Sequence, residues 1–99
     1  MSTIIVQHDD CFHHNPGPNH PESPRRIKAI LSGLDEVKSL EKLPAPQATV
    51  EQIRAVHPVD FWTGIQQQEP AEGRIAIDAD TFLNRGSNDA ALRASGGLC

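Results

Sequence analysis

The sequence predicts an α/β fold, in which helices cover a parallel sheet. The first observation behind this prediction is the β-branched run Thr3–Val6, which is followed by polar residues and is typical of a fully buried parallel strand. The second is a series of apolar residues at helical spacing after Pro24. Because parallel sheets are covered by helices on both faces, a buried strand followed by amphipathic helices favours this class.

Composition limits the classes of protein to which the chain can belong. Its 99 residues make at most one domain, with 37% apolar and 4% aromatic residues for a modest core. A net charge of −4 without a basic stripe argues against nucleic-acid binding. No apolar run approaches the length of a membrane span, and the N-terminus lacks the features of a secretory signal. Cys11 and Cys99 are expected to be free thiols in a reducing cytoplasm.

The first helix has a clear start. The preceding segment 15–24 holds four prolines and a glycine, which exclude regular structure and predict a stiff loop. Ser23 is a suitable N-cap and Pro24 a suitable first helical residue. One apolar stripe follows, formed by Ile27, Ile30, Leu31, Leu34 and Val37. Pro44 and Pro46 are expected to end the segment.

Two short helices are predicted next. Thr49 and Gln52 fit a capping box, so a helix is expected to run to about His57. Pro58 can open another helix that continues to about Gln68. The side chains expected to pack beneath these helices are Val56, Val59, Phe61 and Trp62.

The last third predicts a loop, a brief extended piece and a final helix. The polar stretch 66–73 contains Pro70 and is expected to be a loop, while Arg74–Asp80 alternates partly and favours an extended piece. Ser87 is expected to cap a helix over 88–95, with the pair Gly96-Gly97 as its stop signal. The expected inventory is therefore one short strand and about four helices.

Cysteine and histidine near the start raise the question of a metal. Zinc is usually held by these residue types, and the segment contains Cys11, His13, His14 and His20. Their spacing, C-x-H-H-x5-H, matches no common structural zinc site. Histidines that make ordinary loop hydrogen bonds are the favoured interpretation, and a metal-binding protein stays open as a third hypothesis.

Four groups of residues resemble, in the correct order, the histone deacetylase family in the branch of the bacterial acetylpolyamine amidohydrolases. The first is the H-D-x-C-x-x-H series from His8 to His14, and the second is G-x-x-H-P-E-x-P-x-R from Gly17 to Arg26. The third is Ala55-Val56-His57. The fourth runs from Asp78-x-Asp80-Thr81 through Ser87, Ala90-Ala91 and Gly96-Gly97. Together they cover nearly all of the chain.

The resemblance implies a fold and a set of site residues. Residues 1–99 would be an incomplete N-terminal segment of an arginase/deacetylase-type parallel-sheet domain. His20, Pro21 and Asp80 would lie at the rim of the substrate pocket, with Asp78 beside them. Arg26 would point into an internal channel through which acetate leaves. Two plainer roles stay open: an ion pair on the helix for Arg26, and the anchor of an Asx-type turn for Asp80.

The family's chemistry is expected to lie outside this chain. The resemblance implies a zinc ion held by Asp-x-His and a later aspartate, a histidine pair that moves protons and commonly a tyrosine. The sequence has no Asp-x-His and no tyrosine. His13-His14 is not the family's pair, which follows a Pro-Gly and comes after the helix that ends in the glycine pair. The chain alone is thus expected to bind no zinc and to be inactive.

The resemblance implies that the full enzyme hydrolyses N-acetyl amides of lysine or polyamines. Carboxylates at the pocket mouth would also attract cationic substrates of this kind. The alternative hypothesis is a small non-enzymatic interaction module that binds a partner through apolar helix faces and holds no metal. Because the strand would lack neighbours, the chain is expected to be marginally stable or to self-associate through exposed apolar surface.

Overall fold

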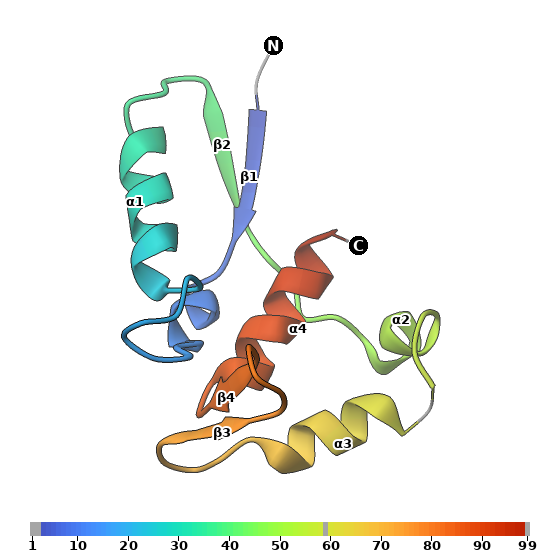
Figure 1. Ribbon diagram of the computed structural model, residues 1–99. Helices are drawn as coiled ribbons and strands as arrows, with labels where there is room; N and C mark the ends of the chain where they lie inside the picture. The colour runs from blue at the N-terminus through green and yellow to red at the C-terminus, as the bar shows by residue number, and fades with distance from the viewer. Residues whose placement is uncertain (1–2, 59, 99) are drawn as a thin grey trace.

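The computed structural model describes residues 3–58 and 60–98; the expectations for Val59 and Cys99 lie outside the described residues. Figure 1 shows the order of the elements along the chain. They are β1 (Thr3–Gln7), the short 3-10 helix η1 (Asp9–His13), α1 (Pro24–Leu34), β2 (Leu40–Pro44), α2 (Val50–Arg54), α3 (Phe61–Gln68), β3 (Arg74–Ala76), β4 (Phe82–Asn84) and α4 (Ser87–Leu98).

The unit formed by β1, α1 and β2 confirms the α/β class. β1 and β2 pair in parallel, in a register that runs from Thr3↔Leu40 to Gln7↔Pro44, and α1 lies in the connection between them. The expectation of a single strand without neighbours was wrong, because the residues before Pro44, which the sequence analysis assigned to the segment of the first helix, form β2. The expected full burial of β1 was also wrong: Ile4 is 53% exposed and Val6 is 41% exposed.

The start of α1 is confirmed and its end is earlier than expected. The Ser23 hydroxyl accepts a hydrogen bond from the Arg25 N–H at 3.2 Å, and Pro24 occupies the first turn. The helix ends at Leu34 instead of continuing to Val37. A turn in which the Val37 N–H donates to the Leu34 carbonyl takes the chain out of the helix toward β2.

The middle of the chain forms two short helices. At α2 both bonds of the capping box are present: Thr49 Oγ1 accepts from the Gln52 N–H, and Gln52 Oε1 accepts from the Thr49 N–H. α2 ends at Arg54, and a further turn reaches His57. α3 begins at Phe61, whose N–H donates to the Pro58 carbonyl. Val56 is 77% exposed, which contradicts its expected packing.

β3 and β4 form an antiparallel hairpin. Its three residue pairs are Arg74↔Asn84, Ile75↔Leu83 and Ala76↔Phe82. The extended piece expected within Arg74–Asp80 is confirmed for the residues of β3, and β4 was not foreseen. Since β4 has only three residues, it carries no periodic pattern that could be detected in the sequence.

α4 is the last helix, and it packs against the segment that follows β2. It continues through Gly96-Gly97 to Leu98, so the expected stop was wrong. Gly96 instead allows close approach of the segment after β2, because a Cβ there would overlap the Pro46 carbonyl and lie 2.7 Å from the Ala48 nitrogen. Nearby, the Ala48 N–H donates to the Leu92 carbonyl at 2.9 Å.

One arginine of α4 also ties this helix to the start of the chain. Arg93 Nε lies 3.1 Å from Asp10 Oδ2, and its Nη1 donates to the Ala45 carbonyl at 3.0 Å. The ion pair joins α4 to η1, and the second bond joins it to the segment after β2. Segments that are far apart in sequence are thus held together around α4, which lies near the centre of Figure 1.

The buried core of the described residues is small. Its apolar members are Ala45, Ala48, Leu83 and Ala90, whereas many larger apolar side chains are exposed. Among the latter, Ile30 is 58% exposed on α1 and Leu43 is 47% exposed on β2. In the same residues no helix is long and apolar enough to cross a membrane.

Candidate functional site

Two of the expected rim residues, His20 and Asp80, are in direct contact although 60 residues separate them. His20 Nδ1 accepts a hydrogen bond from the Glu22 N–H at 3.0 Å, so in the neutral ring the proton is on Nε2. His20 Nε2 then donates to the backbone carbonyl of Asp80 at 2.5 Å. This bond joins the proline-rich loop 14–23 to the tip of the β3–β4 hairpin.

An aromatic side chain that the sequence did not reveal completes this contact. The rings of His20 and Phe82 meet edge to face, with centroids 5.9 Å apart and planes at 87°. Such pairs are worth about 0.5–1.5 kcal/mol beyond the area they bury. Pro21, the third expected rim residue, follows His20 directly and is exposed.

The turn of the hairpin is anchored by Asp78. Its Oδ1 accepts the Asp80 N–H at 2.9 Å. This backbone hydrogen bond, followed by one from the Thr81 side chain, holds the pKa of the Asp78 carboxyl below its usual range. The Asx-type role considered for Asp80 therefore falls to Asp78. Within residues 3–58 and 60–98, no hydrogen bond or ion pair engages the Asp80 carboxylate.

A buried hydroxyl, that of Ser87, lies at the base of the hairpin. Ser87 is 4% exposed; its Oγ donates to Asn84 Oδ1 at 2.7 Å and accepts from the Asn84 N–H at 2.9 Å. It also lies 2.8 Å from His14 Nδ1. Ser87 was expected to cap α4, but the acceptor for the Asn88 N–H is the carboxylate of Glu69 at 2.7 Å.

Asn84 extends this network to the loop. Its Oδ1 accepts the Asn15 N–H at 2.9 Å, and its Nδ2 donates to the His13 carbonyl at 2.8 Å. His14 links the network to Glu22, whose Oε2 lies 3.2 Å from His14 Nε2. The sequence analysis missed Asn84. Its place just before Arg85-Gly86, where asparagine often bonds nearby backbone, was the available signal.

Arg26 lies on the exposed face of α1 beside a small cavity. The cavity has a volume of about 240 Å³ and is also lined by Cys11, His14 and Ile27. In the described part of the chain no carboxylate lies within ion-pair distance of the Arg26 guanidinium, so the helix-local ion pair is not formed. The guanidinium keeps its donors available to a ligand.

The cysteine and histidines near the start do not fit a zinc site. Cys11 Sγ faces the Ala90 carbonyl at 4.0 Å, and burial raises the pKa of its thiol. Both ring nitrogens of His14 and of His20 contact other groups. Among the residues that the structure describes, no group of three or more His, Cys, Asp or Glu side chains is arranged to hold a metal ion.

No protein-family model matches the chain. Individual relatives do. A probable deacetylase from Archaeoglobus fulgidus is 31% identical over 98% of this chain, and histone deacetylase 4 from Caenorhabditis elegans is 29% identical over 94% of it. The crystal structure of the HDA15 HD domain superposes with a TM-score of 0.77 over 97% of the chain.

This chain belongs to the histone deacetylase family. At 23% identity, the likeness to the HDA15 HD domain supports the fold alone. The chain spans 28% of the archaeal relative, 13% of the nematode relative and 30% of the solved chain.

Proposed function

We propose that the chain forms one wall of the substrate pocket of a zinc-dependent deacetylase that hydrolyses N-acetyl amides of lysine or polyamines in the cytoplasm. Residues outside this chain would supply the zinc ligands and the groups that move protons, so the chain alone is inactive. The observation that supports this best is the contact between His20 and Asp80, because it unites two widely separated motifs of the family at one edge. When bound, zinc would polarise the amide carbonyl and activate water.

In this proposal the residues of this chain bind and orient the substrate and the released acetate. His20 fixes the loop against the hairpin through the Asp80 carbonyl, which leaves the Asp80 carboxylate available to an amine or a backbone N–H of the substrate. The guanidinium of Arg26 presents a planar fork of donors that suits a carboxylate such as acetate. The cavity beside it leaves its guanidinium open to such an anion.

The test measures acetate release from an acetyl-lysine peptide and from an N-acetylated polyamine. A longer polypeptide of this family that contains these residues is expected to release acetate, and the 99-residue chain is not. In the longer polypeptide, Asp80→Ala should raise KM by about tenfold, the loss of one charge-assisted hydrogen bond of about 1.5 kcal/mol. Arg26→Ala should lower kcat more than it changes KM. Acetate release by the chain alone would contradict the proposal.

One observation favours the alternative, a non-enzymatic interaction module. A cavity of about 480 Å³ between α2, α3 and α4 is lined mainly by apolar side chains, among them Ile53, Trp62 and Ile65. The assay above separates the two functions. A longer polypeptide that forms no acetate with zinc supplied would favour the module.

A further inference from the structure

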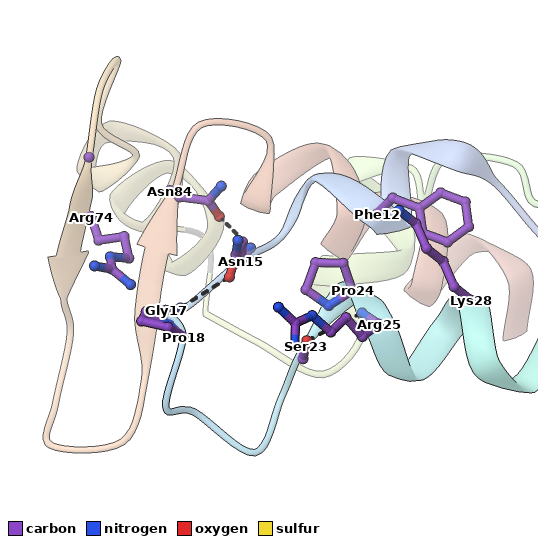
Figure 2. A pocket seen from close by; sticks show the side chains of 11 residues that line it. Phe12, Asn15, Gly17, Pro18, Ser23, Pro24, Arg25, Lys28, Arg74 and Asn84 are labelled. Carbon is purple, nitrogen blue, oxygen red and sulfur yellow. Dashed lines mark hydrogen bonds between the residues drawn. The ribbon is translucent and has the colours of Figure 1, made fainter.

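A cavity beside the start of α1 has cationic walls. It has a volume of about 730 Å³ and lies between the first turns of α1, the loop around Gly17 and the base of the β3–β4 hairpin (Figure 2). The charged residues that line it are Arg25, Lys28 and Arg74, and none of the residues that line it is acidic. This is unexpected in a chain whose net charge is −4.

Local contacts hold two of these cations in place. Arg74 Nη1 donates to the Pro16 carbonyl at 3.2 Å, and its guanidinium rests where a Cβ of Gly17 would be. Gly17 has φ +131°, which disfavours any other residue. Lys28 Nζ lies 5.8 Å from the centre of the Phe12 ring. Figure 2 shows Arg25 and Arg74 on opposite sides of the cavity.

The three positive charges are not neutralised from within. In residues 3–58 and 60–98 no carboxylate forms an ion pair with Arg25, Lys28 or Arg74. Like charges that share a concave surface repel one another and concentrate the positive potential. The first-turn N–H groups of α1, beside Arg25, add to the same potential. The cavity therefore attracts an anionic group that can enter it.

The cavity and the contact between His20 and Asp80 are built on the same loop and the same hairpin. Pro18 lines the cavity and comes two residues before His20, a distance of at most about 7 Å along the chain. On the other side, Arg74 and Asp80 belong to the same hairpin segment. Because Arg74 and Asn84 are at the hairpin base and Asp80 is at its tip, a ligand bound at Asp80 reaches the cavity only when it extends along the hairpin, about 13 Å for the four residues from Asp80 to Asn84.

We propose that this cavity binds an anionic group, a carboxylate or a phosphate, that the substrate carries beside its acetylated amine. The inference rests on the proposed function and makes it more specific: preferred substrates are acetylated lysines with an acidic neighbour, and plain polyamines are poor substrates. Asp80 and the cationic cavity then recognise opposite charges on the same molecule.

The test compares three acetyl-lysine peptides with acidic, neutral and basic neighbours. Binding to the 99-residue chain is followed by NMR or calorimetry at low and high salt. The acidic peptide should bind at least about tenfold more tightly than the neutral one, and salt should reduce this difference. The preference should disappear in the double variant Arg25→Gln/Lys28→Gln. It should persist in the matched control Lys38→Gln/Arg54→Gln, which removes the same charge from exposed positions outside the cavity.

All four substituted side chains are exposed, so both double variants are expected to fold, and circular dichroism checks this. Equal binding of the acidic and neutral peptides overturns the inference, as does an equal loss in the control. Inorganic phosphate provides a further comparison. If phosphate alone binds the cavity as tightly as the acidic peptide does, the cavity is a site for a free anion and its assignment to the substrate is wrong.

Kinetics of the longer polypeptide distinguish the two proposals. Acetate release with equal KM for all three peptides overturns the cavity inference and leaves the deacetylase function standing. Absence of acetate release, together with a preference for the acidic peptide that the double variant loses, supports the cavity as an anion site and removes the deacetylase function. A lower KM for the acidic peptide that rises about tenfold in the double variant supports both.

Discussion

His20 Nε2 donates its hydrogen bond to the backbone carbonyl of Asp80, 2.5 Å away, and not to the carboxylate of that residue. The hydrogen bond that holds the loop against the hairpin therefore does not use the charged group of Asp80. Asp80 takes part in the contact whatever its side chain is, and its carboxylate can serve a ligand. His20 by contrast acts only through its ring.

Substitutions at these two residues should consequently differ. His20→Ala removes the hydrogen bond and should lower the free energy of unfolding by about 1 kcal/mol. Asp80→Ala keeps the backbone carbonyl and should change the free energy of unfolding by less than about 0.5 kcal/mol. Urea unfolding of both variants measures the difference. Equal losses would show that the Asp80 side chain also supports the fold.

Ser87 is the buried centre of the network between the loop and the hairpin. Ser87→Ala leaves the Asn84 N–H and Oδ1 without the hydroxyl that they both bond, and should cost about 1–3 kcal/mol of stability. Ser95 lies on the same helix and is exposed, so Ser95→Ala is the matched control and should change stability by less than about 0.5 kcal/mol. Similar melting temperatures for the two variants would contradict this role.

Replacement by alanine should change the stability of the chain in opposite directions at two of its glycines. At Gly96 a Cβ would overlap backbone atoms of Pro46 and Ala48, which cannot move aside, so Gly96→Ala should destabilise by about 1–3 kcal/mol. At Gly33, inside α1, a Cβ meets nothing within 4 Å, and Gly33→Ala should stabilise by about 0.5–1 kcal/mol. Thermal unfolding tests both. The prediction fails when the two changes have the same sign.

The stability of the hairpin turn should depend on pH, because the turn is anchored by the carboxylate of Asp78. Its pKa is lower in the folded chain than in the unfolded chain, chiefly because of the Asp80 N–H bond. The turn is therefore fully stabilised above the unfolded value of about 3.9 and loses this stabilisation as pH falls through the lower folded value. Carboxyl carbon shifts in NMR should show this titration. Asp78→Asn keeps an acceptor and should remove the pH dependence, whereas a midpoint near 3.9 in the parent chain would contradict it.

Features determined by neighbouring residues could be predicted from the sequence. The capping of α1 by Ser23 and the capping box of α2 depend on side chains two or three residues away, and both are present. The strand β2 could not be identified in this way, because its five residues gain strand character only from pairing with β1. The pair Gly96-Gly97 was misread because glycine serves equally as a stop signal and as a point of close packing.

The candidate site shows the same division. His20 and Asp80 were named from a family resemblance, but their contact joins segments 60 residues apart and needed the structure. Phe82 and Asn84 were missed because their roles come from the hairpin that brings them to the loop. Arg25, Lys28 and Arg74 belong to separate segments, and only the fold places them around one cavity.

The attachment of α4 to the beginning of the chain also governs the order of assembly during translation. Arg93 is the cation that Asp10 pairs with, and Leu92 supplies the acceptor for the Ala48 N–H. Both leave the ribosome after more than nine-tenths of these 99 residues have been made. Until then the nascent β1–β2 unit lacks its contacts with α4, so chaperones that protect apolar surface can act on it before α4 emerges.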